Sequence, residues 1–539
     1  MIPLESRPRP ESVSGVLLLP GEGCGRNRGR VGLLPLTVLR TAESALYHDM
    51  TVGYPIINQV FDTGSLDHSA DSGAVTGCSA SVHSVELRKY ESSNTYTRSC
   101  HDSLRTTVTR NIVLVTQDSL RADHCSFMGY DRQTTPALDE LAREGVVFEN
   151  ATAAGVPTIA SMTSVMTGEY SLASPEIGFD TQQREQVTSR RTLAEALSDA
   201  GYSTGACSPN PPASSYFGFD DGFDWFEDFL GQDQSVGERL WNRVLDRSIK
   251  GGGAATYLRL LRNLVQREEV LRPWEDYYEQ ILDWRSRVEE PYFLWVLLLE
   301  PHHPWMPPKQ SRHWSSRSDI YRSFGHYWEM LSSDWKPDYS ERDHQRLIDL
   351  YDDSIRHGDR FVERLRNDLA DDDPVFVVHA DHGEEFGEHG RYGHQPFLYD
   401  SLVHVPLVIA NAGRQGTISR PVSLRSLATT IADLADVPNG FSGANLLAGA
   451  DTGPSWAISK VFAGGERRAA VRTEHAKYIH ERGQEELYDL QFDPEEQVDL
   501  ADQQPEVTAE FGDILSRHVG TEHERRAIDD VSETLLESA

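Results

Sequence analysis

The chain has 539 residues, of which 38% are hydrophobic, and its 84 acidic and 51 basic residues give a formal net charge of -33. This length and composition suit a large globular core with a second domain and exclude a chain that is disordered throughout. The strongly acidic balance excludes nucleic acid and anionic lipid as main partners. Only six of the basic residues are lysine, and such a carboxylate-rich surface is typical of a halophilic protein.

The acidic excess is confined to one part of the chain. Residues 1–110 hold eleven basic and eleven acidic residues, so the whole excess of 33 lies downstream. The leading segment is also rich in Pro, Gly and Ser and shows no sustained hydrophobic period. Two explanations stay open for residues 1–107: a disordered or family-specific extension, or a start codon placed too far upstream. Neither gives this segment a catalytic role.

The apolar residues do not form the pattern of a membrane span or of a standard signal peptide. No apolar run approaches the ~18 residues that span a bilayer, and the start MIPLESRPRPE lacks a basic region followed by an apolar core. The acidic body contains only Cys125 and Cys207, which is too few for a disulfide framework. We therefore expect a cytoplasmic protein without an integral membrane segment.

A buried strand opens the acidic body. Residues 111–116 (NIVLVT) form a continuous β-branched run, the pattern of a strand covered on both faces, and this strand leads to Asp118. Three helices are predicted next, each beginning near a threonine and closed by a glycine. The first is capped by Thr135 and ends at Gly145, the second runs from about Thr158 and ends at Gly168, and the third is capped by Thr192 and ends at Gly201.

Strands and helices continue to alternate downstream. A second buried run begins at Tyr292 (YFLWVLLLEPHHPW), and a weakly periodic stretch with insertions and helices, 215–290, precedes it. The remaining predictions are a long helix at 343–369, strands at 374–380 and 405–410, a helix capped by Ser423, short strands beyond about 455, and an acidic helix from about 505.

This alternation predicts an α/β protein, with a large, mostly parallel central sheet sandwiched between helices. A smaller α+β domain follows at the C-terminal side. We place the main domain at residues 108–455 and the smaller domain at 456–539.

The segment 379–394 (HADHGEEFGEHGRYGH) concentrates carboxylates and imidazoles directly behind a predicted strand. Asp381 and His382 stand at the strand end, and Gly383 permits a sharp turn, so both side chains could face one divalent ion. The alternative is a solvated polar loop. Two further predicted strands end near Asp118 and His302, and ligands collect at the carboxyl ends of strands in open α/β sheets.

Thr158 offers a hydroxyl at the first turn of a predicted helix, after the loop AAGVP. The free N–H groups and the dipole of a helix N-terminus favour an alkoxide and the oxygens of a bound phosphate or sulfate. A metal ion touching this hydroxyl would lower its pKa and make it a usable nucleophile. The alternative role of Thr158 is a helix cap.

Six motifs together resemble the sulfatase family of the alkaline phosphatase superfamily, over residues 111 to about 505 and in the order of that family. They are NIVLVTQDSLRADH, TTPALDELAREGVVFENA, TIASMTSVMTG, EPHHPW, DHGEEFGEHGRYGH and ELYDLQFDPEEQVDLA. The resemblance implies an alkaline phosphatase-like fold and a metal-dependent hydrolase or transferase of sulfate or phosphate esters.

The resemblance also implies roles for individual residues. Asp118 matches the first metal-binding aspartate, and Asp381 with His382 matches the second metal-binding pair. His302 matches the histidine that contacts the ester oxygens, and His394 stands where many sulfatases have a substrate-binding lysine. We expect Asp118, Asp381, His382 and Thr158 to hold one Mg, Ca or Mn ion, with Zn possible.

The nucleophile position departs from the sulfatase pattern. Formylglycine sulfatases have Cys or Ser there, then Pro or Ala two residues later and Arg two residues after that, whereas this chain has Thr158, Ala160 and Met162. Threonine cannot become formylglycine because its β-carbon carries a methyl group. Thr158 instead resembles the nucleophile of phosphodiesterases and of phosphoglycerol or phosphoethanolamine transferases, so a phosphoester substrate is favoured.

The predicted mechanism begins with attack by the Thr158 alkoxide on the phosphorus or sulfur of a small-molecule, glycan or lipid-head-group ester. His302 and His394 would hold the nonbridging oxygens or protonate the leaving group. The alternative is a non-catalytic anion-binding or regulatory protein with a degraded site, suggested by Met162 and by Ser119, where many sulfatases have a second aspartate. The oligomeric state stays open.

Several weaker candidates have structural explanations. Asp353 and His357 share one helix face four residues apart, but a packing helix is favoured over a second metal site. His303 is expected to be an exposed neighbour of His302. Arg121 could contact an anionic substrate or pair with Asp123, and the ion pair is favoured. The loop residues Glu384, Glu385, Glu388 and His389 are either a polar loop or direct ligands.

Overall fold

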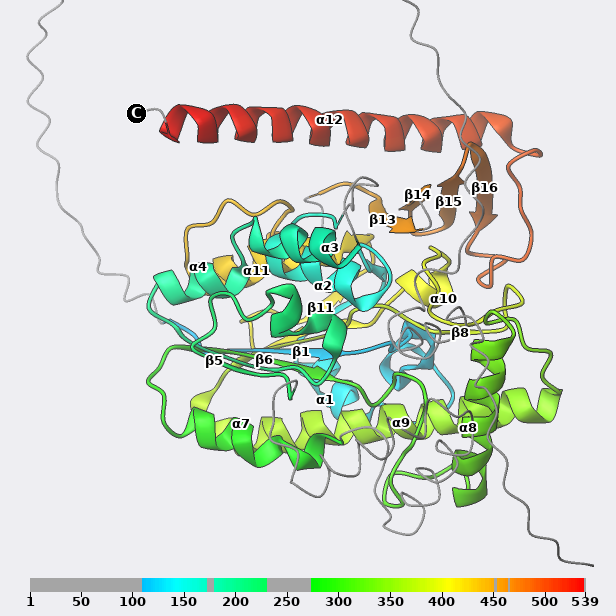
Figure 1. The fold of residues 1–539 in the computed structure, drawn as a ribbon, viewed down its shortest axis with the longest axis horizontal. Coiled ribbons are helices and arrows are strands. Elements are labelled where there is room, and N and C mark those ends of the chain that lie inside the picture. Colours follow the sequence, from blue (N-terminus) through cyan, green and yellow to red (C-terminus); the bar gives the residue numbers. More distant parts are fainter. Residues whose placement is uncertain (1–108, 172–178, 230–272, 450–452, 464–465, 538–539) are drawn as a thin grey trace, which may run out of the picture. The chain divides into compact units, whose positions relative to one another are not determined.

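The computed structural model describes residues 109–171, 179–229, 273–449, 453–463 and 466–537. The predicted extension at 1–107 lies outside these residues, as does the middle of the weakly periodic stretch. Elements keep the labels of Figure 1.

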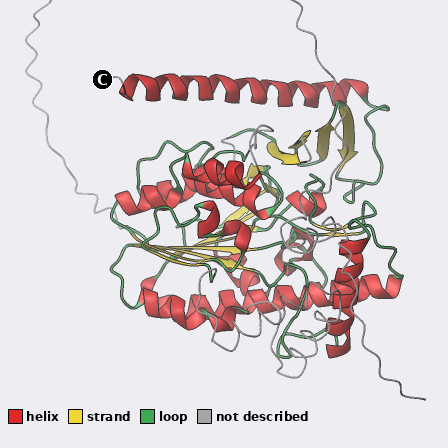
Figure 2. Ribbon diagram, in the orientation of Figure 1, coloured by secondary structure: helices red, strands yellow, loops and turns green. Residues whose placement is uncertain are grey.

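An eight-stranded sheet forms the centre of the fold, in the order β11-β2-β10-β7-β1-β6-β4-β5 (Figures 1 and 2). Its strands are β1 (Ile112–Gln117), β2 (Val146–Phe148), β4 (Ser203–Cys207), β5 (Trp225–Glu227), β6 (Tyr292–Leu298), β7 (Val375–Ala380), β10 (Leu407–Ala410) and β11 (Gly416–Ile418). Neighbouring strands run parallel except at β10, which is antiparallel to both β7 and β2. The predicted mostly parallel sheet is therefore confirmed.

The register of the three central strands fixes where the polar residues meet. Gln117, the last residue of β1, lies beside Leu298 of β6 and Ala380 of β7 in the parallel ladders. All three strands are buried along their whole length, as their apolar runs predict. The residues that follow Gln117 and Ala380 therefore emerge side by side at one edge of the sheet.

Helices cover both faces of this sheet (Figure 1). Residues Ile112 and Leu114 of β1 pack on the side of α2, α4 and α11, whereas Val113 and Val115 pack on the side of α1, α7 and α9. The described α-helices are α1 (Pro136–Glu144), α2 (Thr158–Thr167), α3 (Phe179–Thr188), α4 (Leu193–Asp199), α7 (Tyr278–Arg285), α8 (Arg317–Ser332), α9 (Glu341–Asp368), α10 (Asp400–Val403), α11 (Leu427–Leu434) and α12 (Pro505–Glu537). The predicted sandwich is confirmed.

Helix starts show where local patterns succeed and where they fail. Thr192 caps α4 in a reciprocal capping box, as expected. Thr135 stands at the N-cap position of α1, but its hydroxyl does not cap the helix. The carboxylate of Asp359 on α9 instead accepts hydrogen bonds from the first amides of α1, at 2.8 and 3.0 Å. A tertiary contact therefore supplies this cap.

The other helix boundaries shift by a few residues. The long helix α9 starts at Glu341, two residues before the predicted start, because the Ser340 hydroxyl accepts from the Asp343 amide. Ser423 caps the 3-10 turn Leu424–Ser426, and α11 begins only after it.

A separate antiparallel sheet lies at the C-terminal side, with β13 (Ala457–Ala463), β14 (Glu466–Arg472), β15 (Ala476–Glu481) and β16 (Gln484–Asp489) in sequence order. Two further pairs of two-residue strands complete the described strand set: β3 (Ala151–Thr152) pairs with β12 (Val422–Ser423), and β8 (Glu385–Phe386) pairs with β9 (Tyr392–Gly393). The C-terminal strands share a small core with the start of α12. The domain boundary at 455 stays a prediction.

The 33-residue helix α12 is the longest described helix. Its buried positions Phe511 and Leu515 contact the C-terminal sheet's core. Among the described residues, no helix is both long and apolar enough to cross a membrane.

A buried ion cluster ties the C-terminal sheet to the helix α10. The fully buried ammonium of Lys477 lies 2.8 Å from Asp400 Oδ1 and 3.0 Å from Glu496 Oε1. Arg472 adds a second cation, with Nε 3.0 Å from Asp400. Burial alone would raise the pKa of Asp400, but Arg472 and Lys477 outweigh it and hold this pKa below its usual range.

We expect Lys477→Met to lower the free energy of unfolding by about 3–5 kcal/mol, because two buried carboxylates lose their shared cation. Chemical denaturation of the purified protein measures this change. The exposed Lys309→Met is the matched control and should stay within about 0.5 kcal/mol of wild type. Equal losses in the two variants would contradict the role of the buried cluster.

Candidate active site

Two strand ends bring the predicted metal ligands together. Asp118 directly follows β1, and Asp381 and His382 directly follow β7, whose ends are level with each other. All three side chains are fully buried, and their possible ligand atoms lie within 4.8 Å of one another. The structure therefore places these residues around one point, as the sequence predicts.

The two carboxylates are held in place but are not saturated with hydrogen bonds. Asp381 Oδ1 accepts from the amides of Ser119 (3.2 Å) and His382 (2.9 Å), whereas its Oδ2 is buried and has no hydrogen-bond partner. Asp118 Oδ1 accepts from the Ser119 hydroxyl at 3.0 Å. A buried carboxylate oxygen without a partner is costly, and a cation would satisfy it.

The hydrogen bonds of His382 fix its tautomer. Its Nδ1 lies 2.9 Å from the Gly383 carbonyl oxygen, which can only accept, so Nδ1 carries the proton. Nε2 is left with its lone pair, 3.5 Å from Asp381 Oδ2 and 3.8 Å from Asp118 Oδ1. A backbone contact of this kind is the usual second partner of a metal-binding histidine.

The electrostatics of the pair also suit a cation. Burial, with a further contribution from the Asp381 carboxylate, raises the pKa of Asp118 to about 8, although His382 acts in the opposite direction. A divalent ion would favour the ionised form of both carboxylates. Two carboxylates, one imidazole and a hydroxyl fit Mg, Ca, Mn or Zn.

Thr158 contributes the hydroxyl of this site. It is the first residue of α2, is 2% exposed, and its Oγ1 lies 3.1 Å from His382 Nε2. Pro157 occupies the N-cap position, so the alternative role of Thr158 as the helix cap is wrong. The hydroxyl instead faces the side chains of His382 and Asn210 at the N-terminal end of α2.

Asn210 also belongs to the site, although the sequence analysis missed it. Its amide Nδ2 donates to Asp118 Oδ2 and lies 3.4 Å from Thr158 Oγ1, and the residue is 3% exposed. Asn210 follows β4, which is parallel to β6. The short run STGAC lacks a strong apolar pattern, and recognising it as a strand would have placed Asn210 at the same sheet edge.

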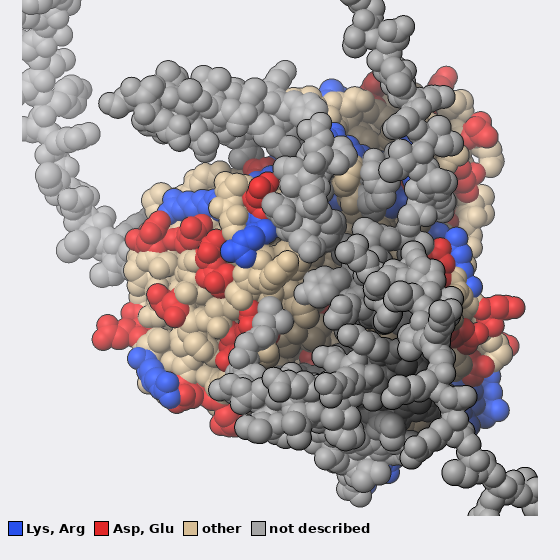
Figure 3. All heavy atoms as spheres, in the orientation of Figure 1, with Lys and Arg blue, Asp and Glu red and all other residues tan. Residues whose placement is uncertain are grey.

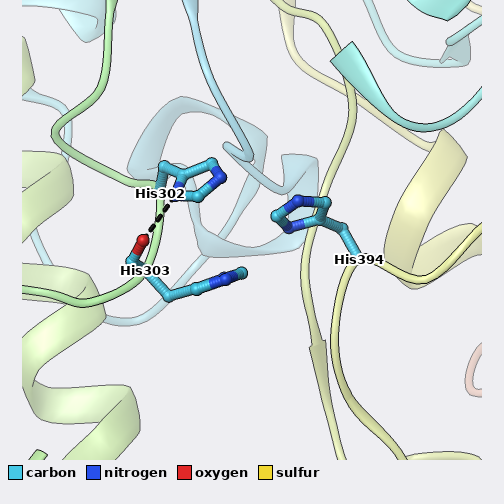
Figure 4. Close-up of side chains that lie close together, drawn as sticks. All are labelled: His302, His303 and His394. Atoms are coloured by element: carbon cyan, nitrogen blue, oxygen red, sulfur yellow. Dashed lines mark hydrogen bonds between the residues drawn. The ribbon is translucent and has the colours of Figure 1, made fainter. Parts of the chain in front are cut away.

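Three histidines form a second cluster beside the first (Figure 4). His302 and His394 come together as predicted, with ring centroids 4.8 Å apart, and the His394 ring lies 4.7 Å from that of His382. The third member is His303, which is only 4% exposed. The expectation that His303 is an exposed neighbour is wrong.

Burial lowers the pKa of His302, and its neighbours His303 and His394 lower it further. This ring is therefore neutral around neutral pH.

Glu384 holds two of these rings. Its fully buried carboxylate accepts from Nδ1 of His303 at 2.9 Å and from Nδ1 of His394 at 3.1 Å. Burial alone would raise the pKa of Glu384, but the two histidines outweigh it and keep the pKa well below its usual range. The solvated-loop interpretation is therefore wrong for Glu384. It is also wrong for Glu385, which is fully buried and pairs with His389 and Arg391.

Two other predicted pairs have structural roles. Arg121 forms ion pairs with Asp123, at 2.7 Å, and with Glu388, which confirms the expected ion pair. Asp353 accepts from three successive backbone amides, those of residues 313–315, so its oxygens are already used. His357 lies 3.2 Å from Glu275. Asp353 and His357 therefore have structural contacts, in agreement with the packing helix that the sequence analysis favoured over a second metal site.

The sulfatase family model matches residues 110–437, which is more than half of the chain. The chain belongs to the sulfatase family. It is accordingly a hydrolase of sulfuric or phosphoric esters.

Similar proteins span much of this sulfatase-family chain. An arylsulfatase of Clostridium perfringens is 25% identical over 441 residues, which cover 72% of this chain and 90% of the relative. Arylsulfatase K of Homo sapiens is 24% identical over 339 residues, which cover 52% and 62% of the two chains.

Among solved structures, the phosphonate monoester hydrolase of Agrobacterium radiobacter has a TM-score of 0.56 at 20% identity and covers 76% of this chain and 96% of its own. The structure of BT4656 in complex with D-glucosamine-2-N,6-O-disulfate has a TM-score of 0.54 at 17% identity, with 76% and 97% covered. These likenesses support the alkaline phosphatase-like fold.

The raised pKa of Asp118 predicts a pH dependence of stability in metal-free protein. Between its ordinary 3.8 and about 8, the folded chain keeps a proton that the unfolded chain has released, so the free energy of unfolding falls as pH rises through this window. Denaturant unfolding in EDTA should show this decline, and Asp118→Asn should flatten it. Saturating Mn²⁺ should remove the decline in wild type. Equal slopes for wild type and variant in EDTA would contradict this origin.

Proposed function

We propose that this sulfatase-family hydrolase uses Thr158 as its nucleophile on phosphate or sulfate esters, with phosphate esters favoured. One divalent cation would be held by Asp118, Asp381 and His382. The observation that carries the proposal is the position of the buried Thr158 Oγ1, 3.1 Å from His382 Nε2 at the first turn of α2. A hydroxyl at this position lies beside a predicted metal ligand and at the helix N-terminus, where backbone amides can bind an anion.

The ligand set prepares this hydroxyl for attack. A divalent cation bound by these side chains would act as a Lewis acid, lowering the pKa of the hydroxyl and polarising the ester. The protein's own contribution is orientation, because Asp118, Asp381 and His382 are buried and their hydrogen bonds prevent them from turning away. Asn210 positions the site further by contacting both Asp118 and Thr158.

The reaction then proceeds in two displacements. Thr158 Oγ1 attacks phosphorus or sulfur in line, and the bond to the leaving alcohol breaks, which forms a covalent ester on Thr158. Water, or an acceptor alcohol in a transferase, releases the group in the second step. His302 and His394 lie at the same edge and serve the nonbridging oxygens or the leaving group.

The preference for phosphate rests on the nucleophile. Thr158 cannot form the aldehyde of formylglycine sulfatases, so no formylglycine is expected. Met162, where those enzymes carry arginine, is fully buried in the core on the α2 side of the sheet. The substrate class stays broad: a small-molecule, glycan or lipid-head-group ester.

We expect Thr158→Ala to lower kcat at least ~10³-fold, because the variant lacks the attacking oxygen, whereas Thr158→Ser keeps a hydroxyl and should retain measurable turnover. Nitrophenyl phosphate, bis-nitrophenyl phosphate and nitrophenyl sulfate are suitable substrates, assayed in high salt with Mn²⁺, Mg²⁺, Ca²⁺ or Zn²⁺. Thr163→Ala on the same helix is the matched control, because among the described residues the Thr163 hydroxyl donates its hydrogen bond to the Ile159 carbonyl oxygen of its own helix, outside the site.

Two outcomes would overturn this assignment. Activity that is unchanged in Thr158→Ala would remove Thr158 from the mechanism. A folded wild-type protein without turnover of any ester, with any of the metals, would favour the anion-binding alternative.

The phosphate preference has its own test. We expect kcat/KM for nitrophenyl phosphate to exceed that for nitrophenyl sulfate by at least about tenfold, a difference of ~1.4 kcal/mol in transition-state binding. Acid quenching during phosphate turnover, followed by peptide mass spectrometry, should find the phosphoryl group on Thr158. A higher kcat/KM for the sulfate ester would reverse the assigned preference.

A further inference from the structure

We propose that His302, His303 and His394 form a second metal site, which takes a first-row transition ion such as Zn²⁺. One ring nitrogen from each histidine lies within 4.8 Å of the others. Figure 4 shows the three rings gathered around one space, with His302 and His303 on one segment and His394 opposite them. This site is additional to the metal site at Asp118. Its role in the reaction rests on the proposed function, whereas its ability to bind a metal ion does not.

The tautomers of all three rings favour metal binding. Nδ1 of His302 is hydrogen-bonded to the His303 carbonyl oxygen, and Nδ1 of His303 and of His394 to the Glu384 carboxylate. Carbonyl and carboxylate oxygens only accept, so each Nδ1 carries a proton, and Nε2 is the nitrogen of each ring that can offer a lone pair to a metal ion. Among the described residues, none of these Nε2 atoms has a hydrogen-bond partner.

Glu384 supplies the outer support that such sites require. A carboxylate that binds the far nitrogen of a ligand histidine fixes the ring orientation and increases the basicity of the ligand. Glu384 does this for two ligands at once, at 2.9 and 3.1 Å, and it is fully buried. The backbone carbonyl of His303 does the same for the third ligand.

With a metal ion bound, His302 and His394 serve the ester oxygens of the proposed function through that ion, and direct binding of the substrate by the rings is the competing explanation. A ring can donate from Nε2 to a phosphate oxygen only if it also carries a second proton, because Nδ1 already holds one. Ring centroids lie 4.4 to 4.8 Å apart in this cluster, so several imidazolium ions would repel one another strongly. A cation bound by the neutral rings avoids this repulsion and still offers positive charge to the ester oxygens.

The donor set distinguishes the two sites chemically. Three imidazoles select Zn²⁺, Co²⁺, Ni²⁺ or Cu²⁺ over Mg²⁺ and Ca²⁺, whereas the oxygen-rich set at Asp118 and Asp381 accepts the harder ions. The two sets are neighbours, since the rings of His382 and His394 lie 4.7 Å apart. Ions in both would flank the same ester, as in two-metal hydrolases.

Metal stoichiometry of the full-length protein tests the proposal. After stripping with EDTA and equilibration with excess Zn²⁺ followed by gel filtration, elemental analysis should find two ions per wild-type chain and one per chain of His303→Gln. Glutamine keeps an N–H for Glu384 but provides no imidazole. The matched control His313→Gln removes an exposed histidine and should still bind two. Equilibration with Mn²⁺ should leave one ion in each of the three proteins and thereby shows that each is folded.

Affinity and spectroscopy provide a second readout. Co²⁺ titration of wild type should show two binding steps, with visible absorption from the histidine site that is lost in His303→Gln. Glu384→Gln should weaken the histidine step about 10–100-fold. One Zn²⁺ per wild-type chain, or equal Zn²⁺ contents in wild type and His303→Gln, would overturn the proposal. The number of bound metal ions does not depend on whether Thr158 is the nucleophile. A missing second ion would therefore overturn only the histidine site, whereas unchanged activity in Thr158→Ala would overturn only the proposed function.

Discussion

The buried repulsion between Asp118 and Asp381 is the constraint around which this fold is organised. Parallel pairing of β1 with β7 brings the two carboxylates to one sheet edge, and neither can turn to solvent because both are fully buried. The raised pKa of Asp118 and the unpaired Oδ2 of Asp381 are two signs of the same imbalance. A divalent cation removes it, and Thr158 and Asn210 lie where they would experience that cation's field.

Buried charges in two other clusters among the described residues are balanced by oppositely charged side chains of the chain itself. Asp400 and Glu496 share the ammonium of Lys477, and Arg121 lies between Asp123 and Glu388. Among the described residues, no lysine or arginine forms an ion pair with Asp118 or Asp381, and the nearest basic side chain is the imidazole of His382. Two buried carboxylates that share one site without a Lys or Arg partner are more consistent with binding an ion than with packing.

The sequence predicts those parts of the site that follow continuous apolar runs. Asp118 and Asp381 were found because the strands before them are buried on both faces, and Thr158 because a glycine closes its helix. Asn210 was missed because its strand is short and weakly patterned. The burial of His303 and Glu384 depends on contacts between segments about 80 residues apart, which local periodicity does not record. The Asp359 cap of α1 was missed for the same reason.

The segment that follows β7 connects the two clusters, because it supplies His382 to the first and Glu384 and His394 to the second. Gly383 makes this possible: a β-carbon there would lie 2.1 Å from the Ser401 carbonyl oxygen, so no larger residue fits without moving the backbone. The Gly383 carbonyl also accepts the Nδ1 proton of His382. A displacement of this one residue would therefore change the tautomer control of His382 and the position of Glu384 together. The positions of His382 and Glu384 therefore depend on each other. The tight packing of Gly383 against the Ser401 carbonyl oxygen keeps the two residues close together.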